Sequence, residues 1–214
     1  MNKLSNNILI FAVVVLFAAV MSSQAQLREI VTVEAAAKTA ANVGAKLPEF
    51  SLKDSTGSTV TSKKLLESGN LVLVFYRGSW CPFCNKYLHT LQTRLADIKA
   101  AGGTLVAISV ENPDASMAIA KKNELNFTVL SDPNLDTARK LGIVYQLPPE
   151  TNEKYIGYGI DLAKQNSMEK PELPLAATYI INKKGIITYA FIETDYKKRA
   201  EPDVIIENLK KVGK

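Results

Sequence analysis

The chain has 214 residues, a length typical of one domain with a short extension. Its 47% hydrophobic and 22% charged residues, with two cysteines, exclude a disordered chain, a collagen-like chain and a disulfide-rich scaffold. The net charge of +5 comes mostly from scattered lysine pairs, and Tyr196-Lys197-Lys198-Arg199 is the one short basic run with an aromatic residue. No nucleic-acid partner is therefore predicted.

The start of the chain has the pattern of a secretory signal. Lys3 precedes an apolar run over residues 8–21, and Ser23-Gln24-Ala25 supplies small residues where a signal peptidase cleaves. This pattern predicts a signal peptide at residues 1–25 and a secreted or periplasmic protein with no stable membrane insertion after cleavage. An uncleaved anchor is the alternative, although the run is shorter than the roughly 20 residues that span a membrane.

Residues 26–45 are rich in alanine and are interpreted as a leader segment or short helix ahead of a domain at 46–214. That domain begins with an extended entry at 46–50 and a turn at 54–57. Residues 71–76, Leu-Val-Leu-Val-Phe-Tyr, form a continuous apolar run. Such a run predicts a central strand that is covered on both faces.

Helices and strands alternate through the rest of the chain. Apolar residues at spacings of three and four predict one amphipathic helix that ends at Ala101. The further predicted elements are strands at 105–110 and 127–130, helices at 112–123 and 135–141, a β-hairpin with strands at 177–181 and 186–192, and a helix at 202–212. Residues 144–173 predict no regular element. The alternation predicts an α/β fold, a thioredoxin-like three-layer sandwich with a mixed central sheet.

Both cysteines lie in one Cys-x-x-Cys motif, between the predicted central strand and the helix that follows it. Near a helix N-terminus, the Cys81 thiolate is favoured by free N–H groups and by the helix dipole. Cys84, one turn further on, can resolve a mixed disulfide on Cys81, which predicts a redox-active pair. Two inert buried thiols are one alternative. A zinc site needs more ligands than these cysteines and His89, the only histidine, supply, and neither a metal nor a cofactor is predicted.

Several segments, taken in order, resemble a known family. They are Val43–Leu52, Phe75-Tyr76, Ser131-Asp132-Pro133 and Tyr179–Gly185. Together they resemble the peroxiredoxins of the alkyl hydroperoxide reductase and thiol-specific antioxidant family, while Trp80–Cys84 resembles the active-site turn of thioredoxin. The resemblance implies a thioredoxin-like fold in a peroxiredoxin-like frame, with Cys81 and Cys84 as the catalytic residues.

The match to that family has two departures. The family's Thr-x-x-Cys pattern puts Cys84 at the peroxidatic position and Cys81 in place of the threonine. The family's arginine falls at Ala176, where a trans peptide bond is also expected because proline is absent. Arg77 is the nearest cation, and we expect it to restore part of the lost charge beside Cys84. Slow peroxide turnover is the consequence that these departures predict.

The remaining candidates are interpreted as supporting or structural. Trp80 is expected to shield the disulfide or to contact a partner. His89 is predicted to point away from Cys84. The tyrosines of the 144–173 stretch are predicted to belong to a passive insertion rather than a lid, and Glu193, Asp195 and Tyr196 to a solvated loop. These tyrosines are Tyr145, Tyr155 and Tyr158.

The predicted function is that of a thiol-disulfide oxidoreductase with an antioxidant role, cycling between a Cys81/Cys84 dithiol and disulfide. Cys81 is predicted to be the exposed nucleophile toward a partner protein. The first alternative is a thiol-dependent peroxidase that reduces hydrogen peroxide or organic hydroperoxides with an external reductant, in which Cys84 attacks and Cys81 resolves. The second alternative is a non-catalytic redox-sensing module.

Overall fold

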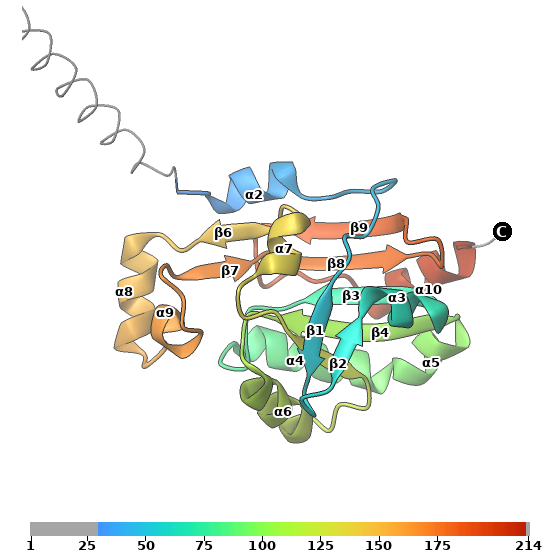
Figure 1. Cartoon of the computed structure of the whole chain (residues 1–214), viewed down its shortest axis with the longest axis horizontal. Coiled ribbons are helices and arrows are strands. Elements are labelled where there is room, and N and C mark those ends of the chain that lie inside the picture. The colour runs from blue at the N-terminus through green and yellow to red at the C-terminus, as the bar shows by residue number, and fades with distance from the viewer. Residues whose placement is uncertain (1–29, 213–214) are drawn as a thin grey trace, which may run out of the picture. The chain divides into compact units, whose positions relative to one another are not determined.

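The structure, a computed structural model, describes residues 30–212, so the predicted signal peptide lies outside the described residues. The strands are β1 (Ser51–Asp54), β2 (Thr59–Thr61), β3 (Asn70–Phe75), β4 (Gly103–Ser109), β5 (Thr128–Ser131), β6 (Val144–Gln146), β7 (Glu172–Pro174), β8 (Ala176–Ile181) and β9 (Ile187–Glu193). The helices are α2 (Val33–Thr39), α3 (Ser62–Glu67), α4 (Pro82–Thr93), α5 (Leu95–Ala100), α6 (Pro113–Lys122), α7 (Asp136–Lys140), α8 (Pro149–Gly157), α9 (Leu162–Gln165) and α10 (Pro202–Lys211). Figure 1 traces them in chain order.

A seven-stranded mixed sheet has the order β2-β1-β5-β4-β3-β8-β9. Strand β3 is parallel to β4 and antiparallel to β8, and β8 is antiparallel to β9. Consequently β3, β4 and β9 run in one direction, and their carboxyl ends lie at the same edge of the sheet. The predicted thioredoxin-like α/β fold with a mixed central sheet is confirmed.

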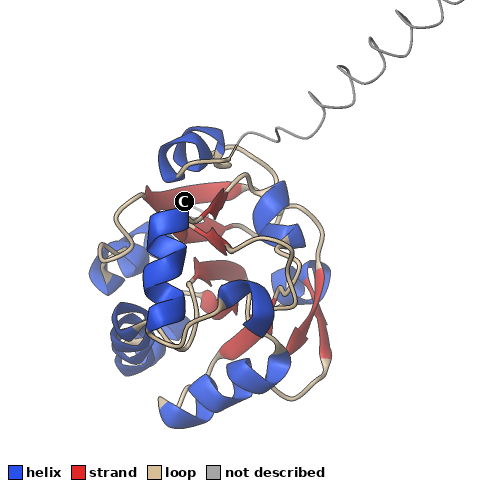
Figure 2. Ribbon diagram, turned by 90° about the vertical axis from the view of Figure 1, so that its left-hand side faces the viewer, coloured by secondary structure: helices blue, strands red, loops and turns tan. Residues whose placement is uncertain are grey.

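The central strand β3 is buried on both faces, as its apolar run predicts. Because successive side chains point to opposite faces, Leu71 and Leu73 pack into one core cluster, and Val72 and Val74 into another. The first face is covered by α2, α3 and α7, and the second by α4, α5 and α10. Figure 2 shows helices on both sides of the strands, which makes the predicted three layers.

The predicted helix from the cysteines to Ala101 is wrong in one respect, because two helices occupy it. Helix α4 ends and α5 begins at Arg94, whose φ of −106° and ψ of 8° are not helical. The Arg94 N–H donates to the carbonyl of Leu91, three residues back, instead of the fourth, and its side chain pairs with Asp97. This tight turn interrupts the ladder while both helices keep their apolar sides on the sheet.

Residues 144–173, which predict no regular element, are ordered. Strands β6 and β7 pair as a separate two-stranded sheet, and α8 and α9 lie between them in the chain. Leu162 and Leu173 are fully buried in the first core cluster. The segment is therefore anchored at its base, and it brings α8 close to the motif of the two cysteines.

Residues 31–45 also pack on the domain. Ala36 of α2 is fully buried, the Val31 carbonyl accepts from the Gln146 N–H at 3.0 Å, and the Thr39 hydroxyl donates to the Gly142 carbonyl at 3.0 Å. Within residues 30–212 no helix is long and apolar enough to cross a membrane, and every peptide bond is trans, including the one before Ala176.

Candidate active site

The two cysteines lie where β3 ends and α4 begins. Cys81 is the N-cap of α4 and Pro82 its first residue, as the motif predicts. The Cys81 N–H donates to the Gly78 carbonyl at 3.2 Å, and the Cys84 N–H donates to the Cys81 carbonyl at 3.1 Å. Both side chains are free thiols. One helical turn therefore holds the two sulfurs together.

Both sulfurs are buried, so the prediction of an exposed Cys81 is wrong. Cys81 is 2% exposed and Cys84 0%, and Trp80 and Tyr196 pack against the cluster that contains them. Trp80 is folded back onto Gly78 so closely that a Cβ there would lie 2.3 Å from the indole nitrogen. A protein disulfide cannot reach either sulfur without displacing these rings, whereas a small molecule needs far less room.

Arg77, directly after β3, is enclosed by aromatic rings. Its guanidinium carbon lies 3.9 Å from the ring centre of Tyr196, 4.9 Å from Trp80 and 5.5 Å from Tyr155. Nη2 donates to the Tyr155 hydroxyl, and Nη1 lies 3.9 Å from the Cys81 sulfur. The sequence predicts Arg77 beside Cys84, and the structure corrects this to Cys81, because the strand end turns toward the N-terminus of α4.

Arg199, after β9, supplies a second cation. Its Nη2 lies 3.3 Å from the Cys84 sulfur, and its Nη1 donates to the carbonyls of Tyr196 and Lys198. Within residues 30–212, no carboxylate lies within 4 Å of either Arg77 or Arg199. Their charges are therefore directed at the sulfurs, and the predicted deficit of positive charge from Ala176 is wrong.

These contacts shift the pKa values of the two thiols in opposite directions. A hydrogen bond from the Cys84 thiol, aided by the Cys84 N–H, Arg77 and Arg199, lowers the pKa of Cys81 to about 6 against the opposing effect of burial. The same hydrogen bond, together with burial, raises the pKa of Cys84 well above its usual value. At neutral pH Cys81 is the thiolate and Cys84 holds the proton.

A buried carboxylate fixes the turn before Cys81. Glu111, just after β4, accepts hydrogen bonds from the Ser79 N–H and hydroxyl, both at 2.7 Å. Asn85 Nδ2 adds bonds to the carbonyls of Ser79 and Cys81, at 2.7 and 2.9 Å. Burial raises the pKa of Glu111, and the bonds from Ser79 oppose that rise. The turn is held from β4 and from α4 at once.

Of the other candidate residues, some contact the site and others are exposed away from it. His89 is exposed on α4, as predicted. Tyr155 lies on Trp80, with ring centres 5.5 Å apart, so it contacts the site, whereas Tyr158 is 78% exposed. That the insertion is passive stays a prediction. Tyr196 covers Arg77 and packs at 5.8 Å on Phe83, so its assignment to a solvated loop is wrong.

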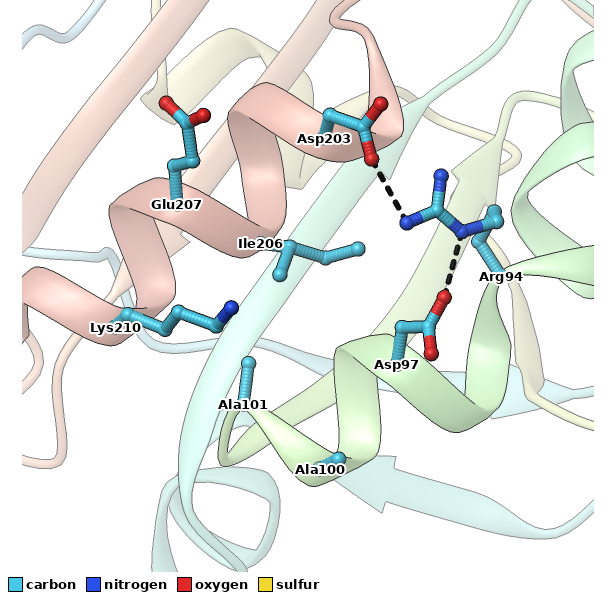
Figure 3. Close-up of a pocket in the computed structure, with 8 residues that line it drawn as sticks. All are labelled: Arg94, Asp97, Ala100, Ala101, Asp203, Ile206, Glu207 and Lys210. Atoms are coloured by element: carbon cyan, nitrogen blue, oxygen red, sulfur yellow. Dashed lines mark hydrogen bonds and ion pairs between the residues drawn. The ribbon is translucent and has the colours of Figure 1, made fainter.

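One groove adjoins the site and another does not. The adjoining groove, of about 700 Å³, is lined by Phe83, Lys86, Tyr87, Thr90, Phe191, Glu193, Lys197, Lys198, Arg199, Glu201 and Pro202. Figure 3 shows the other, of about 520 Å³ between α5 and α10, where Arg94 pairs with Asp97 and Asp203. It contains no cysteine.

No cluster of three or more His, Cys, Asp or Glu side chains in residues 30–212 could hold a metal.

Sequence reasoning gave no role in the site to Arg199, Tyr196 or Glu111. They follow the carboxyl ends of β9 and β4, which share one sheet edge with the end of β3. In open α/β sheets this edge is where ligands bind. A predicted strand order would therefore have directed attention to these residues, although no local motif marks them.

Comparisons with known proteins agree with the predicted resemblance. The model of the AhpC/TSA family matches residues 43–190. Chloroplastic peroxiredoxin Q of Populus jackii is 28% identical over 80% of this chain, and that of Triticum aestivum 29% over 69%, covering 67% and 58% of those relatives. Among solved structures, peroxidoxin BcpB of Mycobacterium tuberculosis has a TM-score of 0.64 and 18% identity over 81% of this chain and 99% of its own.

Proposed function

Because the chain belongs to the AhpC/TSA family and is a thiol-dependent oxidoreductase of that family, we propose that it is a peroxidase in which Cys81 attacks the peroxide and Cys84 resolves. The observation that carries the proposal is the pairing of each buried sulfur with a guanidinium that no carboxylate neutralises. A buried thiolate beside a fixed positive charge suits a small substrate that develops negative charge on oxygen as it reacts.

Unused hydrogen-bond donors support a peroxide as the substrate. On the Cys81 side of the site, the Nε atom of Arg77 and the indole Nε1 of Trp80 are buried without a hydrogen-bond partner in the described residues. Unpaired buried donors are costly, so each calls for an explanation such as strain, a catalytic role or a bound water or other small molecule. A peroxide supplies two acceptor oxygens and is small enough for a site whose cysteines are 2% and 0% exposed.

The chemistry proceeds in two steps. The Cys81 thiolate attacks one peroxide oxygen, the O–O bond breaks, and the leaving oxygen takes a proton, so the sulfur becomes a sulfenic acid while the peroxide is reduced by two electrons. Cys84 then loses its proton and attacks the Cys81 sulfur, the S–O bond breaks, and water leaves as the disulfide forms. An external dithiol reductant restores both thiols.

Trapping distinguishes this assignment from attack by Cys84, the position that the family pattern favours. Cys81→Ser should abolish reaction with hydrogen peroxide. Cys84→Ser should still react and should accumulate a sulfenic acid on Cys81 that dimedone labels, because nothing resolves it. Mass spectrometry of the labelled protein reads the outcome, and dimedone on Cys84 of the Cys81→Ser variant would instead establish Cys84 as the attacking residue.

Exchange with protein disulfides is the second candidate activity. The low pKa of Cys81 at the N-cap of α4 and the exposed Phe83 between the two cysteines favour it. It requires Trp80 and Tyr196, whose rings cover the two sulfurs, to move. Insulin reduction tests it, with the Cys84→Ser variant expected to trap a mixed disulfide on Cys81.

For the location of the protein, we propose secretion or residence in a periplasm, on the sequence of residues 1–25 alone. Mass spectrometry of the exported protein should then find its N-terminus at or near Gln26. An intact Met1 on that protein would refute cleavage and leave the redox proposal untouched.

A further inference from the structure

Two arginines serve one pair of thiols, and they do not have the same neighbours. Arg77 reaches Cys81, the thiolate, while Arg199 reaches Cys84, which carries the proton. Arg199 approaches from the far end of the chain, 115 residues after Cys84. Arg199 also lowers the pKa of Cys81, but less than Arg77 does, and the sulfur it touches, at 3.3 Å, is that of Cys84. Its position therefore calls for a larger role in the second step than in the first.

We propose that Arg199 is a positioning residue for resolution: it holds Cys84 in the first turn of α4 and stabilises the thiolate that forms there after Cys81 has reacted. The inference rests on the proposed function, in which Cys81 attacks first. It assigns a different step to each arginine: Arg77 acts mainly in the attack on the peroxide, and Arg199 acts mainly in the closure of the disulfide.

The physical reason is a change of charge between the two steps. Before attack, the Cys81 thiolate accepts the hydrogen bond from Cys84 and repels a second negative charge, and both effects keep Cys84 protonated. Attack converts Cys81 into a neutral sulfenic acid, so both effects disappear. Burial then opposes ionisation of Cys84, and the Arg199 guanidinium, in direct contact, favours it.

Arg199 is anchored well enough to act in this way. Its Nη1 is held by two backbone carbonyls, and its guanidinium carbon lies 5.7 Å from the ring centre of Tyr87. Tyr87 is itself fixed, because its hydroxyl donates to the Ala200 carbonyl at 2.8 Å. The loop after β9 thus presents the guanidinium to α4 in one orientation. Arg199 also lines the adjoining groove.

Other titratable groups also face Cys84. They are Tyr76 and Arg77 at the end of β3, Glu111 after β4, and Tyr145 of β6. Burial raises the pKa of both tyrosines, so they stay neutral near pH 7. Glu111 opposes a negative charge on Cys84, and the Arg77 N–H favours it. Among the side chains in contact with the Cys84 sulfur, Arg199 is the cation whose removal should change the second step selectively.

Stopped-flow fluorescence of Trp80, the only tryptophan, separates the steps after hydrogen peroxide is mixed with the reduced protein. Arg199→Gln should slow disulfide closure about tenfold at pH 7, move the pH midpoint of closure upward by about one unit, and slow attack clearly less than it slows closure. Arg199→Lys should keep closure within about threefold of the wild type. Arg94→Gln, the same change in the groove of Figure 3, should alter neither step.

Three results would overturn the assignment of Arg199: closure at the wild-type rate in Arg199→Gln, an equal slowing of both steps, or equal slowing by the lysine and glutamine variants. If the wild type does not react with peroxide, the proposed function fails instead. The disulfide 5,5′-dithiobis(2-nitrobenzoate) then replaces peroxide, since release of its first thiolate reports attack by Cys81 and release of the second reports resolution by Cys84. Arg199→Gln should slow the second release alone.

Discussion

Arg77 and Arg199 stand on two sides of one pair of thiols, in unlike surroundings. Arg77 is 2% exposed, among three aromatic rings, and it donates a hydrogen bond to the hydroxyl of Tyr155. Arg199 is half-buried, is held by backbone carbonyls, and borders an open groove. The enclosed charge suits a step that excludes water, and the charge beside the groove suits a step in which a proton must leave.

The largest expected effect separates the two arginines in the attack step. Arg77→Gln should slow oxidation of Cys81 by hydrogen peroxide about a hundredfold, on the order of 3 kcal/mol, because it removes the charge next to the reacting thiolate. Stopped-flow fluorescence measures the rate, with Arg199→Gln as the matched control. Equal slowing of attack in both variants would refute the assignment of Arg77 and Arg199 to different steps.

The second prediction concerns a substitution at Gly78, next to Trp80, on the side of the site where Arg77 is enclosed. Gly78→Ala should lower the free energy of unfolding by about 2 kcal/mol, because a methyl group meets the Trp80 ring and alanine is strained at a φ of +154°. It should also make Cys81 react faster with iodoacetamide. Urea denaturation compares it with Gly57→Ala, where φ is also positive but no atom lies within 4 Å. Equal losses in the two variants would mean that the ring contact contributes nothing.

The pH dependence of attack tests the charge on the enclosed side. Because the folded-state pKa of Cys81 is lowered to about 6, the reactive thiolate is present above that pH and is lost as the pH falls through it. The oxidation rate should therefore fall about tenfold from pH 7 to pH 5 and change little from pH 7 to pH 8. A rate that still rises steeply above pH 8 would place the pKa of the attacking thiol near its usual value.

The smallest effect concerns the ring that comes from residues 144–173. Tyr155→Phe keeps the ring on Trp80 but removes the hydroxyl that accepts from Arg77, and attack should slow about fivefold, or roughly 1 kcal/mol. Tyr158→Phe, three residues along and exposed, is the matched control. Peroxide kinetics of both variants measure the difference. If the attack rate of Tyr155→Phe equals that of the wild type, α8 only covers the site and takes no part in the attack.

Local patterns were sufficient for the frame and for the two cysteines. The apolar run at 71–76 predicts β3, and Cys-Pro-Phe-Cys before an amphipathic stretch predicts the N-cap of α4, because burial on both faces and helix capping depend on neighbouring residues. Residues 144–173 predict nothing, since β6 and β7 are three residues each and pair across 25 intervening residues that hold two short helices. Such pairing leaves little periodic signal.

The order of residues was enough to predict the α/β alternation, the redox motif, the likeness to the AhpC/TSA family and the position of Cys81 at a helix start. The folded chain was needed to show that both sulfurs are buried, that Arg77 lies beside Cys81, and that Arg199 lies beside Cys84. The reason is that the mixed sheet aligns the carboxyl ends of β3, β4 and β9, so residues more than a hundred positions apart meet at one edge. The residues next to Arg199 in the sequence do not predict its contact with the Cys84 sulfur.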